Sequence, residues 1–378
     1  MSVSVRSALK QNNGVIRLME AHDSTSSDIV RNFHVQGTGF EGLWISGLTQ
    51  TTYLGIPDTE IISPLLRATL QAATIISDSS GDRKLCAAFD ADSGGDIPSI
   101  PTLVQLLESI GVTMIVIEDK DVHAPGQKVN SLLPADGSQP QADPHEFARK
   151  IQTFLQHTYG TDMMITARIE SFNTRIVMAD PVQEEESVRI ALADALFRAA
   201  IYTQAGADAI MIHSKSKKPT EVIEFLKAFR QTDRTTPVVV VPTTYSTTPR
   251  QTLIDAGANV IIYANHLMRA KLKGIAQFAH DQLAENPALF ADDGEARACL
   301  RAWNYGCLLR LLLKKDFNQE ENAEAMKFYM QAQQIAIRDM ARATLELILG
   351  DYSGCEADSL MVTPKELLVV NAIPVANI

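Results

Sequence analysis

The segment "SIGVTMIVIED" at residues 109–119 decides the fold class of this chain. It runs from the end of a predicted helix, through a glycine, into an apolar stretch that finishes with polar residues, here two acids. Two further segments repeat this order, "QAGADAIMIHS" at 204–214 and "DAGANVIIYAN" at 255–265. The glycine of each segment suits the left-handed backbone position that closes a helix before the next strand. These glycines are Gly111, Gly206 and Gly257.

Eight apolar runs of this kind lie in the first two thirds of the chain. In order they are "VIRLME", "GLWIS", "KLCAAFD", "TMIVIE", "MMITARIE", "DAIMIH", "PVVVVPT" and "NVIIYAN". Helical spacing lies between several of them, at 101–109, 184–204 and 220–230. Apolar strands that alternate with helices are typical of a parallel sheet covered on both faces. The sequence therefore predicts an α/β fold, a (β/α)8 barrel of the TIM type, with a doubly wound open sheet as the alternative.

The texture of the sequence changes after Arg269, where Ala, Leu and Met dominate long helical stretches. We therefore expect a catalytic barrel over residues 1–275 and a C-terminal helical extension over residues 276–378. The extension shows no pattern that indicates chemistry, so we expect it to serve packing or oligomerisation.

The overall charge argues against some classes of partner. The 378 residues include 45 acidic and 34 basic ones, which gives a net charge of −11. Such a chain repels nucleic acid and anionic membranes, and any anion that it binds needs a local basic pocket. The four cysteines form no C-x-x-C pair, and no apolar run suits a signal core or a membrane span. We expect a cytoplasmic protein with free thiols that acts on a small molecule.

Polar groups stand at the end of all eight predicted strands, which is where a barrel carries its chemistry. They are Glu20 and His22, Ser46 and Gly47, Asp90 and Asp92, Glu118 to Lys120, Arg168 and Glu170, His213, Thr243, and Asn265 and His266. Packing alone does not explain a polar group at every strand end. The barrel hypothesis therefore places a binding site there.

The acids of "FDADSGGD" indicate a metal site. Asp90 and Asp92 lie two residues apart, so both can face one mouth of the barrel, and Glu118 ends the next strand. Three carboxylates without histidine or cysteine ligands suit Mg²⁺, with Mn²⁺ as the alternative, and do not suit zinc. The structural alternative is a pair of loop-capping aspartates together with one buried ion pair.

Arg168 and His213 add hydrogen-bond donors to the same mouth. A guanidinium at the end of an apolar strand needs a carboxylate or phosphate partner, either a ligand or a neighbour such as Glu170 or Glu118. His213, with Lys215 close behind it, is either a satisfied core histidine or a ligand contact. A divalent metal together with Arg, Lys and His describes a site for a small anion with carboxylate or phosphate groups.

Ten short blocks, in collinear order, resemble the phosphoenolpyruvate mutases of the isocitrate lyase superfamily. Within residues 15–275 they are "LMEAHDS", "GLWISGL", "LGIPD", "DADSG", "IEDK", "KVNSL", "ARIESF", "AGADAIMIHSK", "VVVVPTTY" and "ANHLMRA". The resemblance implies a barrel, Mg²⁺, an α-keto or enol acid substrate, and a homotetramer whose barrels exchange their last helix. It also implies interconversion of phosphoenolpyruvate and 3-phosphonopyruvate, the P–C bond-forming step of phosphonate biosynthesis.

The resemblance also assigns roles to the acids and their counter-charge. Asp90 would bind the metal directly, and Asp92 and Glu118 would act through water. Asp58 corresponds to the reactive-site aspartate, and Lys120 would balance the acidic cluster.

The remaining implied residues would contact the substrate or cover it. Those at the pyruvoyl end would be Trp44, Ser46, Gly47 and Leu48. Those around the phosphoryl group would be Arg168, His213 and Asn130. The gating loop would carry Lys128, Asn130 and Ser131.

The loop distinguishes the branches of the superfamily. "QKVNSL" lacks the cysteine of the carbon–carbon lyase pattern K-[KR]-C-G-H, which argues against cleavage of a related 2-oxo or 2-hydroxy acid. Phosphonopyruvate hydrolase, which passes the phosphoryl group to water, is the nearer alternative, and Asn130 favours the mutase over it.

The segment between Lys120 and Lys128 is longer than in the family, and Gly95 replaces an aromatic residue. A lid that admits water would turn a mutase into a hydrolase. A barrel that binds an acid without turning it over is the third hypothesis.

Overall fold

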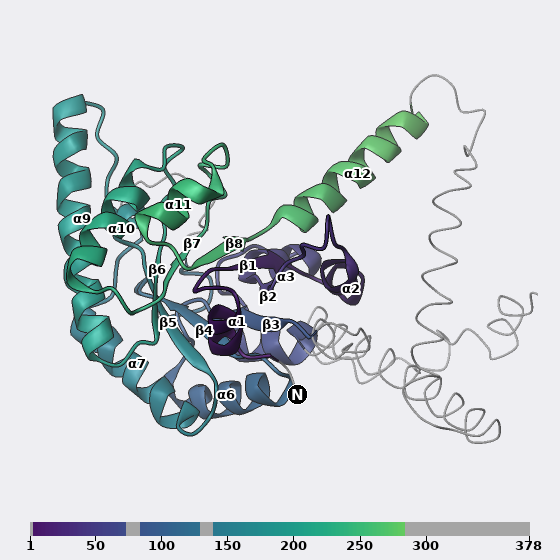
Figure 1. Ribbon diagram of the computed structural model, residues 1–378, viewed down its shortest axis with the longest axis horizontal. Coiled ribbons are helices and arrows are strands. Elements are labelled where there is room, and N and C mark those ends of the chain that lie inside the picture. Colours follow the sequence, from purple (N-terminus) through teal and green to yellow (C-terminus); the bar gives the residue numbers. More distant parts are fainter. Residues whose placement is uncertain (1–2, 73–83, 129–138, 284–378) are drawn as a thin grey trace, which may run out of the picture. The chain divides into compact units, whose positions relative to one another are not determined.

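The computed structural model describes residues 3–72, 84–128 and 139–283. Within these residues, parallel strands close into a barrel whose spatial order follows the chain (Figure 1). The strands are β1 (Ile16–Glu20), β2 (Gly42–Ile45), β3 (Cys86–Asp90), β4 (Met114–Glu118), β5 (Met164–Ile169), β6 (Ala209–Ile212), β7 (Val238–Val240) and β8 (Val260–Tyr263). β1 pairs with β8, for example Leu18 with Ile262, and this pairing closes the sheet. The predicted (β/α)8 barrel is confirmed, and the open doubly wound sheet is excluded.

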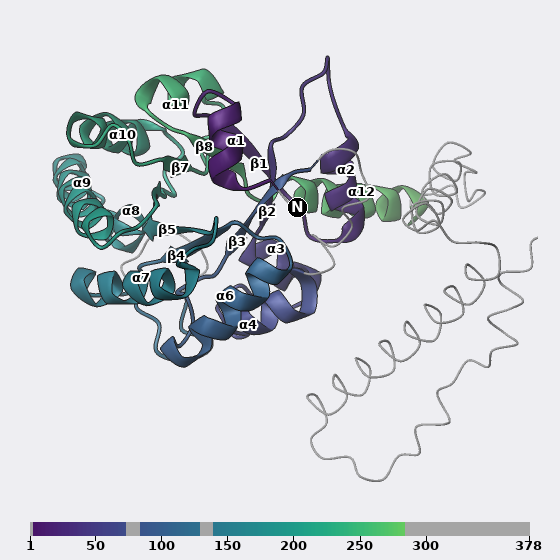
Figure 2. The ribbon, with the colours of Figure 1, turned by 60° about the horizontal axis from the view of Figure 1, so that its bottom comes forward.

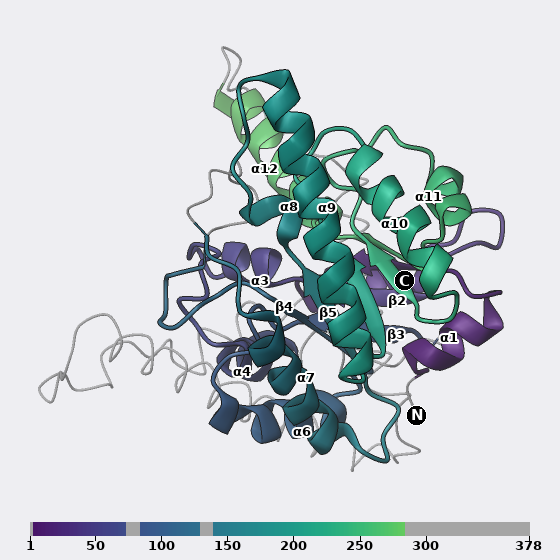
Figure 3. The ribbon, with the colours of Figure 1, turned by 90° about the vertical axis from the view of Figure 1, so that its left-hand side faces the viewer.

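Helices surround the barrel, and Figure 2 shows α6, α7, α9, α10 and α11 around the strands. In chain order the helical elements are α1 (Val5–Gln11), α2 (Ser24–Asn32), α3 (Gly47–Tyr53), α4 (Pro64–Arg67), the π-helix η1 (Ala68–Ala72), the 3-10 helix η2 (Ile97–Ser99), α6 (Ile100–Ser109), α7 (Pro144–Thr158), α8 (Ser171–Thr174), α9 (Pro181–Gln204), α10 (Thr220–Thr232), α11 (Arg250–Ala256) and α12 (His266–Leu283). The long helix α9 lies along the outside of β5 and β6, as Figure 3 shows for β5.

Turn chemistry fixes where these helices begin and end. Gly111, Gly206 and Gly257 have φ angles of 88°, 101° and 117°, so the predicted left-handed positions are confirmed. Asp143 and Asp180 cap α7 and α9, because each carboxylate accepts two backbone N–H bonds ahead of a first-turn proline. These turns fix the residues at which a helix ends and the next element begins.

The alternation of side chains along the strands separates two layers of core. Leu18, Trp44 and Val116 point into the barrel and belong to an inner cluster. Leu43 and Phe89 point outward and pack with the surrounding helices. The barrel interior is therefore filled below the strand ends, and ligand chemistry is left to the mouth.

Helix α1 covers the opposite end of the barrel, where the strands begin. Its apolar residues Val5, Ala8 and Leu9 join the inner cluster. The backbone N–H of Val5 donates to Thr113 Oγ1 just ahead of β4, and Arg6 pairs with Asp208 just ahead of β6. One end of the barrel is thus closed, and the other is available for a site.

The predicted C-terminal extension lies largely outside the described residues, so the division of the chain near residue 275 stays a prediction. Helix α12 begins beside β1, where the N–H of Met268 donates to Glu20 Oε2 at 3.0 Å. Among the helices that can be described, none is long and apolar enough to cross a membrane.

Candidate active site

Three charged residues at neighbouring strand ends form the centre of the site. Asp90 ends β3, Glu118 ends β4, and Arg168 lies near the end of β5. In the strand register Glu118 pairs with Arg168, and Asp90 pairs with Val116, two residues before Glu118. Because side chains alternate along a strand, all three point into the barrel at its C-terminal end. All three are buried.

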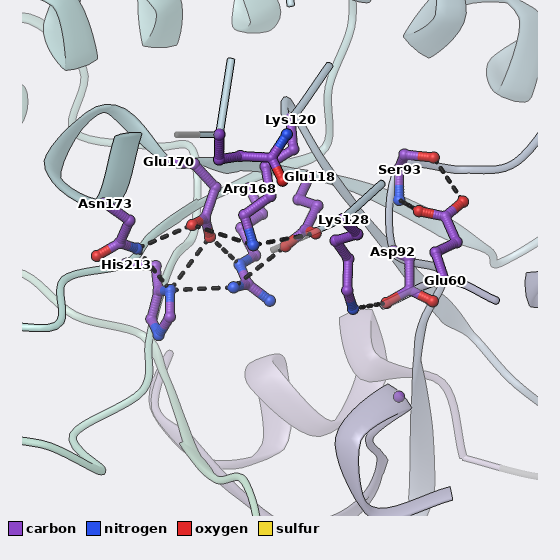
Figure 4. Close-up of polar contacts among 12 residues, drawn as sticks. Glu60, Asp92, Ser93, Glu118, Lys120, Lys128, Arg168, Glu170, Asn173 and His213 are labelled. Atoms are coloured by element: carbon purple, nitrogen blue, oxygen red, sulfur yellow. Dashed lines mark hydrogen bonds and ion pairs between the residues drawn. The ribbon is translucent and has the colours of Figure 1, made fainter. Parts of the chain in front are cut away.

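The Arg168 cluster comprises Glu118, Lys120, Arg168, Glu170, Asn173 and His213 (Figure 4). Arg168 forms ion pairs with Glu170 and, at 3.1 Å, with Glu118. Lys120 Nζ lies 3.4 Å from Glu118 and 3.7 Å from Glu170, so it balances the acids as expected. His213 Nδ1 lies 3.0 Å from Arg168 Nη2. The cluster holds a guanidinium and an imidazole side by side at the mouth.

The Asp92 cluster comprises Asp58, Arg67, Asp92 and Lys128. Lys128 Nζ donates to Asp58 Oδ1 at 2.7 Å and to Asp92 Oδ1 at 2.5 Å. Arg67, from α4, donates to Asp92 Oδ2 and to Gln50 Oε1, both at 2.6 Å. Arg67 is completely buried. The reactive-site aspartate expected from the resemblance therefore lies in one ionic network with Asp92.

Burial and charge act in opposite directions on Asp92. Burial by itself raises the pKa of this carboxyl group, but Arg67 and Lys128 more than offset it and hold the pKa far below its ordinary value. Asp92 is therefore ionised at neutral pH. A backbone φ of 49° places Asp92 in the left-handed region, which costs a non-glycine residue energy that the ionic contacts must offset.

Asp90 has a different environment from Asp92. Its closest hydrogen bonds come from the backbone N–H groups of Gly47 and Asp92, both at the long distance of 3.3 Å. Burial, followed by the negative charge of Asp92, raises the pKa of Asp90 to about 6. An added cation next to Asp90 would therefore favour the ionised form of its carboxylate.

Glu60 lies two residues after Asp58, and its side chain connects this segment with the loop that follows β3. Its carboxylate accepts from Ser93 Oγ at 2.6 Å and from the Ser93 N–H at 3.3 Å. Lys150 Nζ in turn donates to the carbonyl of Ser93 at 2.9 Å. These contacts fix the loop on which Asp92 is carried.

Asp119 connects the Arg168 cluster to helix α9 by hydrogen bonds. Its carboxylate accepts from the N–H of Glu170 at 2.9 Å, from the hydroxyl of Tyr202 at 2.8 Å and from Arg198 at 3.3 Å. Tyr202 and Arg198 belong to α9, so the ends of β4 and β5 are tied to that helix. Buried networks in which every member has a partner hold side chains in one arrangement.

The expected pyruvoyl residues lie on β2 and the first turn of α3. Trp44 points into the barrel, Ser46 precedes α3, and Leu48 is half-buried. A Cβ on Gly47 would lie 3.0 Å from Asp92 Oδ1, so this position has little room for a side chain. The structure thus brings Gly47 next to both Asp90 and Asp92.

The donor set is compatible with a divalent ion that binds directly to a single carboxylate. Within the described ranges, no group of three or more His, Cys, Asp or Glu side chains could hold an ion together. Asp92 faces Arg67 and Lys128, and Glu118 faces Arg168. One direct ligand, Asp90, with the other two acids acting through water fits these contacts, and oxygen donors suit Mg²⁺.

Two expected site residues, Asn130 and Ser131, lie outside the described residues. The structure adds three residues that sequence reasoning did not single out, Arg67, Glu60 and Asn173. Asn173 follows the block "ARIESF" directly, so its closeness to a matched block was the one available signal.

The fold and the site together define a class of protein, a (β/α)8 barrel that gathers buried acids and bases at the C-terminal ends of its strands. The family model described as phosphoenolpyruvate phosphomutase matches residues 5–283. The chain therefore belongs to the phosphoenolpyruvate phosphomutase family, which confirms the resemblance drawn from the sequence.

Three known proteins illustrate the relationship. A phosphoenolpyruvate phosphomutase of Tetrahymena pyriformis is 35% identical over 67% of this chain and 74% of its own length. A phosphonopyruvate hydrolase of Variovorax sp. is 29% identical over 63% of this chain and 74% of its own length. A crystal structure of phosphonopyruvate hydrolase with oxalate and Mg²⁺ has a TM-score of 0.58, covers 81% of this chain and 99% of its own, and is 23% identical. At that identity, the last likeness supports the fold alone.

Proposed function

We propose that this chain interconverts phosphoenolpyruvate and 3-phosphonopyruvate. The observation that carries the proposal is the pairing of Arg168 and His213 at the mouth, beside the Asp58–Lys128–Asp92 network. A guanidinium and an imidazole suit a phosphoryl group, and the neighbouring acids suit a metal-assisted enolate. Membership in the phosphomutase family supports the same reaction.

The reaction moves one phosphoryl group within one pyruvate unit. The P–O bond to the enol oxygen breaks, its electron pair stays on the enolate, and C3 of that enolate then forms the P–C bond. No proton is lost or gained overall. Arg168 and His213 hold the phosphoryl oxygens, and the backbone N–H groups at the start of α3, at Gly47 and Leu48, hold the pyruvoyl oxygens.

Asp58 faces the transferred group in this proposal. It is buried, and its Oδ1 accepts from Lys128 at 2.7 Å. A carboxylate in this position either takes the phosphoryl group or orients it for recapture. Lys128 and Arg67 together offset the charges of Asp58 and Asp92, so an anionic substrate meets less repulsion at the mouth.

Mg²⁺, or Mn²⁺ in its place, would be held directly by Asp90 and through water by Asp92 and Glu118. When bound, the ion supplies positive charge for the oxygens of the enolate and of the α-keto acid. The raised pKa of Asp90, caused by burial and by Asp92, agrees with this assignment, because an added cation would favour the ionised form of the carboxyl group.

Phosphonopyruvate hydrolysis is the second candidate, and the 29% identical hydrolase favours it. Starting from phosphonopyruvate, the two reactions differ in whether the enolate oxygen or water receives the phosphoryl group, so exclusion of water decides between them. Phosphorus NMR of the protein with phosphonopyruvate and Mg²⁺ separates the two. A phosphoenolpyruvate signal that grows before inorganic phosphate supports the mutase. Direct release of phosphate supports the hydrolase, and an unchanged spectrum refutes both.

We further propose a cytoplasmic homotetramer in which barrels exchange their last helix. Leu272 and Ile275 on α12 are 52% and 59% exposed in one protomer, which supports burial of this helix against another copy. Light scattering of the full chain tests the assembly. A monomer at micromolar concentration would contradict it.

A further inference from the structure

Two hydrogen bonds to residues other than His213 determine which way the side-chain amide of Asn173 faces. Its Oδ1 accepts from the backbone N–H of Lys215 at 2.9 Å, and its Nδ2 donates to Glu170 Oε2 at 2.9 Å. Exchange of the two amide atoms would set an N–H against an N–H and an oxygen against a carboxylate. The amide therefore has one orientation only.

This orientation directs a donor at His213. Asn173 Nδ2 lies 2.8 Å from His213 Nδ1, and Arg168 Nη2 lies 3.0 Å from the same nitrogen. Both partners are planar N–H groups that cannot turn into acceptors. Nδ1 must therefore present its lone pair, and the ring hydrogen must sit on Nε2.

Glu170 offers the competing arrangement, in which Nδ1 carries the hydrogen and donates to Glu170 Oε1 at 3.1 Å. That carboxylate oxygen already accepts from Arg168 Nε, and its contact with Nδ1 is the longest of the three. A hydrogen on Nδ1 would also meet two N–H groups. Two shorter donor contacts outweigh one longer acceptor contact.

Two further observations agree with a neutral ring. Burial, followed by the positive charge of Arg168, lowers the pKa of His213 below its ordinary value, so the imidazole is neutral at pH 7. In Figure 4 the second ring nitrogen of His213 points away from Glu170 and Asn173. Among the residues that the structure describes, no hydrogen bond occupies Nε2.

We infer that Asn173 is a positioning residue that fixes His213 as the Nε2–H tautomer, so that this N–H donates to a phosphoryl oxygen of the substrate. The role of the donor rests on the proposed function, whereas the tautomer itself does not. Asn173 touches no substrate, and it acts only through His213. The same logic explains why loss of the correct histidine tautomer is costly in hydrolytic triads.

The first measurement needs no variant. Magic-angle-spinning nitrogen NMR of the full chain, labelled with ¹⁵N-histidine, distinguishes protonated from unprotonated ring nitrogens, and the spectrum of His213→Gln identifies the His213 signals. We expect a protonated Nε2 and an unprotonated Nδ1 at pH 7. A protonated Nδ1 in the unmodified protein overturns the inference.

Asn173→Asp then replaces the donor by an acceptor of the same shape. We expect Nδ1 to become protonated and kcat/KM for phosphoenolpyruvate to fall roughly 10- to 100-fold, the loss of one hydrogen bond to a charged group. Thr174→Val is the matched control on the same short helix, because it removes side-chain hydrogen bonds to Gln141 and to the backbone carbonyl of Glu170 but none to His213. Thr174→Val should leave the His213 signals and the rate near those of the unmodified protein.

Asn173→Ala covers the case in which Asn173→Asp does not fold. Without the amide donor, one donor, Arg168 Nη2 at 3.0 Å, and one acceptor, Glu170 Oε1 at 3.1 Å, remain next to Nδ1, so the Nδ1 signal should shift part of the way toward the protonated form. Unchanged His213 signals in Asn173→Ala or Asn173→Asp overturn the role of Asn173. If the NMR results are as expected but no variant and no unmodified protein turns over either substrate, the tautomer assignment stands and the proposed function fails.

Discussion

Replacing Arg67 by methionine tests whether the buried ionic network holds the barrel mouth together. Arg67 is completely buried and donates to Asp92, to Gln50 and to the carbonyl of Asp90, at 2.6, 2.6 and 2.7 Å. Methionine keeps an unbranched apolar side chain at this position and removes the charge, the donors and the contact of the guanidinium with the Phe89 ring, which lies 5.2 Å away.

The expected loss follows from the partners that remain. Removing one member of a buried ion pair typically lowers the free energy of unfolding by about 3–5 kcal/mol. Lys128 still contacts Asp92 at 2.5 Å, so we expect the lower end, about 3 kcal/mol. For a barrel of this size that loss lowers the melting temperature by roughly 5 °C.

Thermal unfolding followed by circular dichroism measures this loss, and Arg189→Met is the matched control. Arg189 pairs with Glu186 at the same 2.6 Å, but its side chain is 69% exposed. Its replacement should leave the melting temperature within about 1 °C. An equal change in melting temperature in the two variants, or no change in Arg67→Met, would refute the argument that burial makes the Arg67 contacts contribute to stability.

The effect of Arg67 should also depend on pH. Arg67 and Lys128 hold the pKa of Asp92 far below its ordinary value of about 4, so Asp92 stabilises the fold above that pH and loses this contribution as the pH falls. Without Arg67 the pKa of Asp92 rises and the contribution shrinks. The difference between the two proteins should therefore narrow below about pH 4. A constant difference would mean that Arg67 acts by packing alone.

Three further predictions concern single residues. Asp58→Ala should lower kcat by roughly 1,000-fold or more with an unchanged far-ultraviolet spectrum, and near-normal turnover would remove Asp58 from the mechanism. Asp90→Asn should raise the Mg²⁺ concentration for half-maximal activity by about 10-fold or more, and an unchanged metal dependence would mean that Asp90 is not a ligand. Complete burial raises the pKa of the Cys86 thiol to about 12, so iodoacetamide at pH 8 should label Cys86 only after unfolding. Mass spectrometry of the Cys86 peptide checks this, and rapid labelling of the native protein would contradict it.

The strands could be predicted from the sequence because their burial leaves a local mark. Parallel strands covered on both faces must be apolar throughout, so "TMIVIE" and "DAIMIH" are visible as strands without any knowledge of their neighbours. The glycine before each strand adds a conformational requirement that few other residues meet. The site residues Asp90, Glu118 and Arg168 followed, because a barrel brings strand ends together.

The partners of these residues could not be predicted in the same way. Arg67 meets Asp92 across 25 positions, Asn173 meets His213 across 40, and Lys128 meets Asp58 across 70. Each contact depends on how a loop or a short helix returns to the mouth, which no local pattern encodes. The sequence therefore indicates where charge is placed, and only the fold shows which charges neutralise one another.

The closure of the barrel by α1 has a consequence for synthesis on the ribosome. Helix α1 is made before every strand, yet the groups that hold it come much later in the chain. The hydrogen-bond partner of the Val5 N–H is Thr113, 108 positions downstream. The partner of the Arg6 side chain is Asp208, 202 positions downstream. Until β6 has emerged, the apolar face of α1 has no permanent place to pack, and a nascent chain must keep that face from other hydrophobic surfaces. A helix that is translated ahead of the barrel strands thus reaches its final contacts only after most of those strands have emerged.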